Sequence, residues 1–275
     1  MADLPSDVAK KTNFANAGYD NIRVVMVNTS HPGNIGAAAR AIKTMGLKRL
    51  YLVAPQDFPS DQATWRSSGA TDVLENAVVT ETFAEAIDDC DLIIGASARL
   101  RRIPWPLLNP RQCGATVAVE SIRRQVALVF GREDRGLTND ELQRCHYHVN
   151  IPANEDYGVL NVAAAIQIVA YEIRMALLGL EGLGGEDETN TTCHAQSEQM
   201  QLATVRWDER MATSQELEYF YQHLEKTLVA LDFHDRDNPR QLMTRFRRLY
   251  NRIRPDHMEI NILRGMLTAI NKKII

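Results

Sequence analysis

The sequence predicts an α/β domain with a mostly parallel sheet, followed by a small all-helical C-terminal region. Three observations lead to this prediction. Short runs rich in Val, Ile and Leu recur through the first half of the chain, as in strands that are buried on both faces. Segments with helical spacing of apolar residues separate these runs, which is typical of alternating strands and helices. Beyond residue 151 only helical patterns follow.

The predicted strands and helices alternate in chain order. The apolar runs predict strands at residues 22–27, 50–53, 91–96, 126–130 and 148–151. Helical patterns lie between them at residues 35–45, 83–88, 116–123 and 139–144. A long apolar segment, residues 160–178, contains neither proline nor glycine and should close the domain as a helix.

Changes in composition divide the chain into four parts. We expect a polar leader at residues 1–20, the α/β domain at 21–178, a flexible linker at 179–213 that is rich in glycine, acids, threonine and asparagine, and a helical domain at 214–275. In the last part, helical patterns lie at residues 214–231, 239–251 and 255–270, and Thr213 with Glu216 forms a capping box. Because this domain is short, its apolar faces should pack on the first domain or on a second copy.

Composition excludes several classes of protein. No stretch approaches the roughly 20 apolar residues of a membrane span, and residues 1–20 lack a signal-type run, so we expect a cytoplasmic protein without a membrane partner. The four cysteines are scattered without a C-x-x-C pair, which predicts reduced thiols and no metal site. The formal net charge is −4, so binding of nucleic acid would depend on local basic clusters.

Two basic clusters stand out. One consists of Arg99, Arg101 and Arg102 beside Trp105, and the other is a group of C-terminal arginines that includes Arg245, Arg247 and Arg248. Each cluster alone is equally consistent with a solvated basic face. Trp105 lies between two prolines and is equally consistent with a packed side chain.

Three polar or glycine-rich loops follow predicted strands, and ligands of open α/β sheets bind at such loops. Residues 28–36 contain Asn34, Gly33 and Gly36 and lead into a helix that carries Arg40, but they lack the G-x-G-x-x-G pattern of dinucleotide-binding proteins. Residues 131–138 place two glycines around four charged residues, and residues 151–161 end at Asn161. A mere connector seldom needs so many charges at this edge of a sheet.

The ordered set of these motifs resembles the TrmJ-type tRNA 2'-O-methyltransferases of the SPOUT superfamily over most of residues 21–178. The residues that carry the resemblance are Asn34-x-Gly36-x-x-x-Arg40, Val129-Phe130-Gly131-Arg132-Glu133-x-x-Gly136-Leu137, and Ile151 with Leu160-Asn161. The resemblance implies a trefoil knot near the end of the first domain. It also implies a homodimer whose active site takes residues from both subunits.

The resemblance also assigns functions to residues. It implies that S-adenosylmethionine binds against the backbone of Ala96, Ser97, Ala98, Gly131, Ile151, Gly158, Val159 and Leu160. Arg40 corresponds to the essential arginine of the family, and we expect it to position an RNA phosphate and stabilise the developing oxyanion. Asn34, Glu133 and Asn161 should hold the local geometry, with plain loop and helix capping as the alternative. Many relatives carry serine where this chain has Gly158 and Val159, so a hydroxyl role at that position is absent here.

The implied substrate is the ribose of cytidine or uridine at nucleotide 32 of the tRNA anticodon loop. Trp105 with Arg99, Arg101 and Arg102 would suit an extruded nucleotide, and Arg245, Arg247 and Arg248 would bind the body of the tRNA. Alternatives are ribosomal RNA as the substrate, or a non-catalytic RNA-binding module on the same fold. A nucleotide-dependent oxidoreductase is a further alternative from fold alone.

Overall fold

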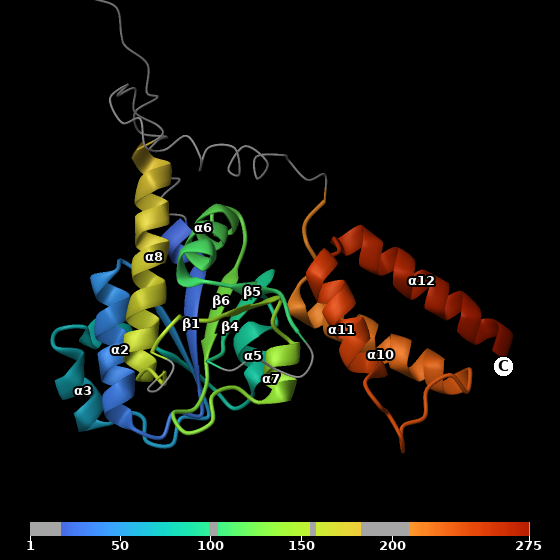
Figure 1. Cartoon of the computed structure of the whole chain (residues 1–275), viewed down its shortest axis with the longest axis horizontal. Coiled ribbons are helices and arrows are strands. Elements are labelled where there is room, and N and C mark those ends of the chain that lie inside the picture. Colours follow the sequence, from blue (N-terminus) through green and yellow to red (C-terminus); the bar gives the residue numbers. More distant parts are fainter. Residues whose placement is uncertain (1–17, 99–103, 155–157, 183–208, 275) are drawn as a thin grey trace, which may run out of the picture.

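The computed structural model describes residues 18–98, 104–154, 158–182 and 209–274. Figure 1 shows a sheet with helices on both faces and a group of C-terminal helices at one side of it. The sheet has seven strands in the order β3-β2-β1-β6-β4-β7-β5, and every adjacent pair is parallel. The predicted fold class, a parallel α/β sheet followed by a helical region, is confirmed. The implied knot stays a prediction.

The strands agree closely with the apolar runs. They are β1 (Ile22–Val27), β2 (Arg49–Val53), β3 (Val78–Thr80), β4 (Leu92–Ala96), β5 (Leu107–Leu108), β6 (Val126–Phe130) and β7 (Tyr147–Val149). The strand expected at residues 148–151 ends two residues earlier, because the chain leaves the sheet after Val149. The sequence analysis missed β3 and β5, which are short strands at the two edges of the sheet.

Each face of the sheet buries its own apolar core. All six residues of β1 are buried: Val24 and Met26 pack on one side, and Val25 and Val27 pack on the other. The first side is covered by α2 (Pro32–Thr44), α6 (Pro110–Glu120) and α8 (Val162–Gly182), and the second by α5 (Phe83–Ile87) and α7 (Asn139–Gln143). This double burial explains why the central strands are unbroken apolar runs.

Three helices differ from the prediction. The helix expected at residues 116–123 is α6, which begins at Pro110 because Asn109 and Gln112 form a capping box before it. The helices α3 (Asp61–Ser67) and α4 (Thr71–Glu75) were not predicted. The buried residues of α3 are only Ala63 and Ser67 and those of α4 are only Val73 and Leu74, so neither helix has a clear apolar stripe; both pack on α2.

The helix α8 is a core helix of the α/β domain. By length and composition residues 162–180 could cross a membrane, and no other helix of the described residues could. However, α8 packs against α2 and α6, and it buries Ile166, Val169, Ile173 and Leu177 in the main core. It also continues to Gly182, inside the range expected as a linker; residues 183–208 of that range lie outside the described residues.

The C-terminal helices are α10 (Ser214–Ala230), α11 (Leu242–Ile253) and α12 (His257–Ile274). The predicted capping box of Thr213 and Glu216 is present at the start of α10. These helices share a small core of their own around Phe220 and Ile260. They also contact the α/β domain, where Ser214 N donates to Cys90 O at 3.0 Å. The expected division into domains stays a prediction.

Candidate active site

The carboxyl ends of four adjacent strands bring the predicted loops to one edge. The sheet order places β1, β6, β4 and β7 next to one another, and they run in the same direction. The loops that follow these strands therefore leave the sheet on the same side, where α/β domains bind ligands. We call this side the carboxyl edge.

Glu133, in the loop after β6, is the centre of a hydrogen-bond network that joins three loops. Its Oε1 accepts a bond from Asn34 Nδ2 at 2.9 Å, and its Oε2 accepts bonds from Ser30 N at 3.2 Å and Ser30 Oγ at 3.1 Å. Asn34 Oδ1 accepts a bond from Asn161 Nδ2 at 2.9 Å. Three of the four predicted catalytic residues therefore lie in one continuous network, although their part in catalysis stays a prediction.

The carboxyl group of Glu133 is held as an anion. Burial raises the pKa of Glu133, but hydrogen bonds from Asn34 and from the backbone N–H groups of Ser30 and His31 outweigh this effect and bring the pKa below its ordinary value. An ionised carboxylate can only accept hydrogen bonds. Glu133 therefore orients the amide of Asn34 and the loop after β1.

Two residues of the network also cap helices. Asn161 Oδ1 accepts a bond from Ala163 N at 2.9 Å in the first turn of α8, and His31 Nδ1 accepts a bond from Gly33 N at 3.1 Å at the start of α2. The alternative of helix capping is thus part of what Asn161 does, alongside its bond to Asn34. The network fixes the starts of α2 and α8 relative to the loop after β6.

Arg40 lies on α2, six residues after Asn34, and its side chain is exposed. Six residues of helix correspond to about 9 Å along the axis. Helical side chains lean toward the N-terminus, so the guanidinium of Arg40 extends toward the carboxyl edge. No hydrogen bond or ion pair joins its guanidinium to any other residue that the structure describes. Arg40 is therefore available to an anionic ligand.

The loop after β6 is closed on itself. Arg132 N donates to Gly136 O at 3.2 Å, and Gly136 N donates to Arg132 O at 2.9 Å. A Cβ atom at Gly131 would lie 2.2 Å from the backbone of Gly136, and Gly136 has a φ of +70°, which favours glycine. Arg132 also donates to Glu141 at 3.0 Å, which ties the loop to α7. These bonds hold the loop closed, and the glycine at position 131 lets the backbone of Gly136 approach it closely.

Two of the loops predicted to bind the cofactor are tied together. Ser97 N donates to Val149 O at 2.9 Å, and Asn150 Nδ2 donates to Ser97 O at 2.9 Å. Ala96 and Ala98 flank Ser97 at the end of β4, and Ile151 follows Asn150. The sequence analysis missed Asn150, although an amide side chain directly after a buried strand could have drawn attention to it.

The third loop that is predicted to bind the cofactor, residues 158–160, presents apolar side chains to solvent. Val159 is 70% exposed and Leu160 is 38% exposed, which is unusual for residues beside a packed sheet. Gly158 leaves no room for a side chain, because a Cβ there would lie 2.9 Å from Asn154 O. The exposed pair gives the carboxyl edge an apolar surface.

The first predicted RNA-binding cluster is described only at Trp105. Its Nε1 donates to Cys145 O at 2.9 Å, and its ring stacks on His148 with 5.6 Å between the ring centroids. One face of the indole is therefore already occupied by His148. The other predicted members, Arg99, Arg101 and Arg102, lie outside the described residues.

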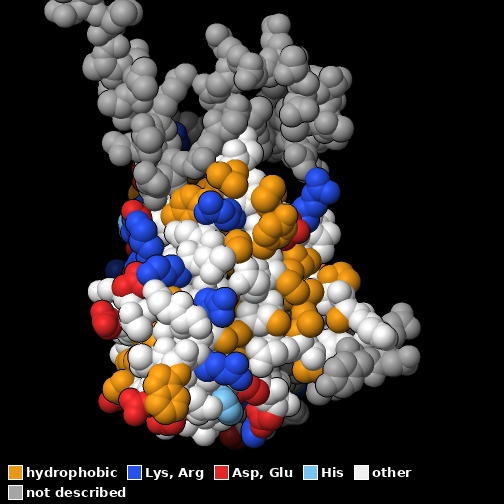
Figure 2. Space-filling view, turned by 90° about the vertical axis from the view of Figure 1, so that its left-hand side faces the viewer, with side chains coloured by type: hydrophobic (Ala, Val, Ile, Leu, Met, Phe, Trp, Pro, Cys, Tyr) orange, Lys and Arg blue, Asp and Glu red, His pale blue; other side chains and the backbone are white. Residues whose placement is uncertain are grey.

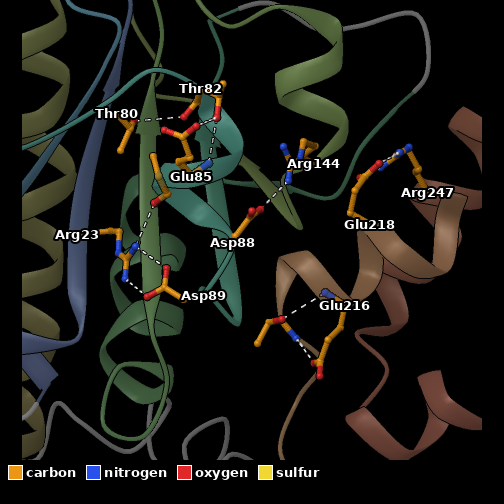
Figure 3. Close-up of polar contacts among 12 residues, drawn as sticks. Arg23, Thr80, Thr82, Glu85, Asp88, Asp89, Arg144, Glu216, Glu218 and Arg247 are labelled. Carbon is orange, nitrogen blue, oxygen red and sulfur yellow. Dashed lines mark hydrogen bonds and ion pairs between the residues drawn. The ribbon is translucent and has the colours of Figure 1, made fainter.

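The second cluster lies on α11. Arg245 is exposed, and Arg248 Nη1 donates to Pro104 O at 3.3 Å. Arg247 makes two bonds of 2.7 Å to Glu218 and lies over the ring of Tyr221. Figure 3 shows the ion pair of Arg247 and Glu218 near the ion pair of Arg144 and Asp88. A phosphate at Arg247 would compete with Glu218.

Comparisons with known proteins identify the family of the chain. Residues 21–171 match the SpoU rRNA Methylase family, and residues 215–275 match the C-terminal domain of the tRNA methyltransferase TrmJ. A TrmJ of Pseudomonas aeruginosa, named tRNA (cytidine/uridine/adenosine-2'-O-)-methyltransferase, is 51% identical over 92% of this chain and 95% of that protein. The chain belongs to the TrmJ group of the SpoU methylase family.

Solved structures of the SpoU methylase family have the same fold. TrmJ from Z. mobilis is 28% identical and superposes with a TM-score of 0.73 over 90% of this chain and 98% of that chain. A probable methylase family protein from Haemophilus influenzae is 42% identical, with a TM-score of 0.56 over 93% of this chain and 98% of that chain. The predicted membership of the TrmJ group, and with it a methyltransferase as the class of enzyme, is confirmed.

Proposed function

We propose that this protein transfers a methyl group from S-adenosylmethionine to the ribose 2'-hydroxyl of cytidine or uridine at nucleotide 32 of tRNA. The observation that carries the proposal is the network of Glu133, Asn34 and Asn161, which joins three loops of the carboxyl edge. Arg40 follows Asn34 on α2, and its guanidinium has no partner among the residues that the structure describes. The curated relatives are named as tRNA 2'-O-methyltransferases, which supports tRNA rather than ribosomal RNA as the substrate.

The carboxyl edge has the features that an adenosine-containing donor requires. Val159 and Leu160 offer exposed apolar surface, and Ile151 lies half-buried at the end of the neighbouring strand. Adenine has a flat apolar face, and backbone groups at Gly131 and at residues 96–98 could meet its polar edges. When bound, S-adenosylmethionine would supply the electrophilic methyl group, and the residues of the chain would hold it beside the substrate.

The role of the protein is then chiefly one of positioning. Methyl transfer needs the ribose oxygen in line with the leaving sulfur, so a rigid edge contributes most of the rate. Arg40 would bind the phosphate next to the target ribose and stabilise the developing negative charge on the oxygen. Arg40 is a poor general base, because a guanidinium keeps its proton at ordinary pH. Val159 has no hydroxyl, so the proton of the ribose must leave by another route.

A homodimer is part of the proposal. Tyr171, Met175 and Leu178 lie along one side of α8 and are 49%, 48% and 39% exposed. Figure 2 shows a band of hydrophobic side chains on this side of the molecule, next to a line of lysine and arginine side chains. The strip lies toward the end of α8 away from the carboxyl edge, where Arg174 donates to Met45 O at the end of α2. An exposed apolar strip of this kind suits contact with a second subunit. We also expect the protein to act in the cytoplasm, where tRNA is matured.

The decisive experiment measures methyl transfer from labelled S-adenosylmethionine to unmodified tRNA transcripts. We expect label at the 2'-oxygen of nucleotide 32 when the base is C or U. A transcript with A at this position tests the wider range in the name of the Pseudomonas aeruginosa relative. Label on ribosomal RNA alone would favour the ribosomal alternative, and binding of tRNA without transfer would favour a non-catalytic module.

The C-terminal arginines can be tested by salt dependence. If Arg245 and Arg248 bind tRNA phosphates, replacing both by alanine should weaken tRNA binding and make it less sensitive to salt. Calorimetric binding of S-adenosylmethionine should be unchanged, because the bonds of Arg245 to Gln241 and of Arg248 to Pro104 involve none of the residues predicted to bind the cofactor. Unchanged affinity for tRNA at several salt concentrations would remove α11 from the proposed RNA surface.

A further inference from the structure

The helix α3 carries an exposed tryptophan that none of the functions above uses. Trp65 is 78% exposed, and no hydrogen bond, ion pair or ring contact joins its side chain to another described residue. Arg66 follows it, is exposed, and likewise has no such contact in the described part of the chain. A single exposed apolar side chain is ordinary, so the positions of Trp65 and Arg66 on the molecule are what matters.

The position of α3 relative to α2 places Arg66 beside the start of the helix that carries Arg40, and Trp65 precedes Arg66 on α3. A Cβ atom at Gly36 would lie 2.1 Å from Ala63 O and 2.9 Å from Arg66 Cβ, and one at Gly33 would lie 3.6 Å from Arg66 Cγ. The two glycines thus let α3 rest directly on the first turns of α2. The stem of Arg66 runs along the start of the helix that carries Asn34.

Arg40 lies on this same side of α2. Residues 33, 36 and 40 are separated by three and four positions, so they share one face of the helix. Lys43, one turn further on, donates from Nζ to Gly69 O at 3.0 Å just after α3, which confirms that this face is turned toward α3. We name this surface the α2–α3 seam and define it by Arg40 on α2 and by Trp65 and Arg66 on α3.

We propose that the α2–α3 seam binds the single-stranded RNA next to the target ribose, with Trp65 stacked on an unpaired base and Arg66 on a phosphate. An indole that is 78% exposed suits a base that is splayed out of a loop, and an adjacent guanidinium suits the backbone of the same strand. The occupant is RNA rather than a purely apolar partner, because Arg40 and Arg66, whose guanidinium groups have no partner among the described residues, accompany the tryptophan. This inference rests on the proposed function and extends the RNA path from Arg40 across α3.

The test compares Trp65→Ala, Trp65→Phe and Arg66→Ala with matched controls on other surfaces. Phe233→Ala removes another exposed aromatic ring, which is 65% exposed in the turn after α10, and Arg123→Ala removes an exposed arginine just after α6. For each variant we would measure the affinity for tRNA, kcat and KM for tRNA, calorimetric affinity for S-adenosylmethionine, and sedimentation.

We expect Trp65→Ala to raise the Kd and KM for tRNA about tenfold, which is the usual effect of removing a stacking aromatic side chain. Trp65→Phe should keep most of the affinity, Arg66→Ala should reduce the salt sensitivity of binding, and both controls should match the wild type. The difference between wild-type and Trp65→Phe fluorescence should change when an anticodon stem-loop RNA is added, because a stacked indole is quenched. The affinity for S-adenosylmethionine should stay constant.

Three results would overturn the inference, and they can be told apart. Wild-type activity with unchanged tRNA affinity in Trp65→Ala would reject the seam while leaving the proposed function intact. A wild-type protein that binds no tRNA would reject both. A changed sedimentation coefficient in Trp65→Ala, with tRNA affinity restored at high protein concentration, would assign the seam to contact between two copies of the chain.

Discussion

At the residue scale, single side chains carry the organisation of the carboxyl edge. Glu133 gathers the loop after β1 through Asn34 and Ser30, and Asn161 links the same network to the start of α8. Arg40 projects beside this rigid frame without a partner among the described residues. We therefore expect substitutions of Glu133, Asn34 or Asn161 to change the geometry of the loops, and substitutions of Arg40 to change the charge at the site.

Arg40→Lys tests the need for a planar guanidinium. Lysine keeps the positive charge but cannot offer two parallel hydrogen bonds to a phosphate, so we expect a loss of at least about tenfold in kcat/KM for tRNA. Thermal unfolding should match the wild type, because Arg40 is exposed. Near-wild-type turnover in this variant would contradict the proposed role.

His146 should make stability depend on pH. Burial, together with the charge of Arg254, lowers the pKa of His146 to about 3, and its Nδ1 accepts a bond from Ile93 N at 3.0 Å. The folded protein thus keeps His146 neutral, whereas the unfolded chain binds a proton below its ordinary pKa of about 6.5. The free energy of unfolding should therefore fall as the pH is lowered below about 6.5, by up to about 1.4 kcal/mol per pH unit.

Urea unfolding at pH 7.5, 6.5 and 5.5 measures this effect. His146→Asn keeps a neutral acceptor for Ile93 N but binds no proton, so its stability should fall less steeply with decreasing pH. The difference between the two slopes isolates His146 from other titrating groups. Equal slopes for the variant and the wild type would show that His146 does not contribute.

At the element scale, the C-terminal helices are attached to the α/β domain by polar contacts at the end of α11. Arg254 donates to Glu120 at 2.6 and 3.1 Å, and both side chains are largely buried. Burial raises the pKa of Glu120, but the bonds from Arg254 outweigh it and keep the carboxyl group ionised. Asn251 adds bonds to Gln143 O at 2.9 Å and Cys145 O at 3.2 Å, just before β7.

Glu120→Gln should therefore loosen α11. It leaves the buried guanidinium of Arg254 without its counter-charge, and we expect a loss of roughly 3 kcal/mol in the free energy of unfolding. Replacing Glu120 by leucine and Arg254 by methionine should recover part of this loss, because the buried guanidinium of Arg254 is removed, while Arg124 still loses its ion pair with Glu120. Denaturant unfolding of the single and double variants provides the measurement. A single variant as stable as the wild type would mean that the pair does not hold α11.

At the scale of the whole molecule, the proposed function needs two surfaces, one for a second copy of the chain and one for RNA. The exposed apolar strip of α8 lies on the same side of the sheet as α2, which carries Arg40. The helices α2 and α8 are neighbours, so the proposed dimer surface and the proposed RNA surface lie on adjacent helices. An active site that is shared between subunits requires this proximity.

Met175→Glu should weaken the dimer, because it would bury a charge in an apolar contact. Sedimentation should show a shift toward monomer, with a parallel loss of methyl transfer at low protein concentration. Phe233→Glu, in the turn after α10, is the control and should leave the mass unchanged. If Met175→Glu sediments as the wild type does, α8 is not the dimer surface.

The sequence by itself determined the α/β class, the bounds of β1 and β6, and the three loops that meet at the carboxyl edge. These features depend on local patterns: β1 and β6 are apolar on both faces, and Asn34, Arg40 and Glu133 lie in short motifs. The edge strands β3 and β5 could not be predicted, because strands of two or three residues leave no periodic pattern.

Only the tertiary structure decided which side chains meet. The bonds of Glu133 to Asn34, of Trp105 to Cys145 and of Arg254 to Glu120 join residues that are 99, 40 and 134 positions apart. Such pairings follow from the order of strands in the sheet and from the docking of α11. The same holds for Arg66, whose place beside the start of α2 depends on Gly33 and Gly36, which let α3 approach. Local sequence sets the chemistry available to the chain, and packing over long separations sets where that chemistry is brought together.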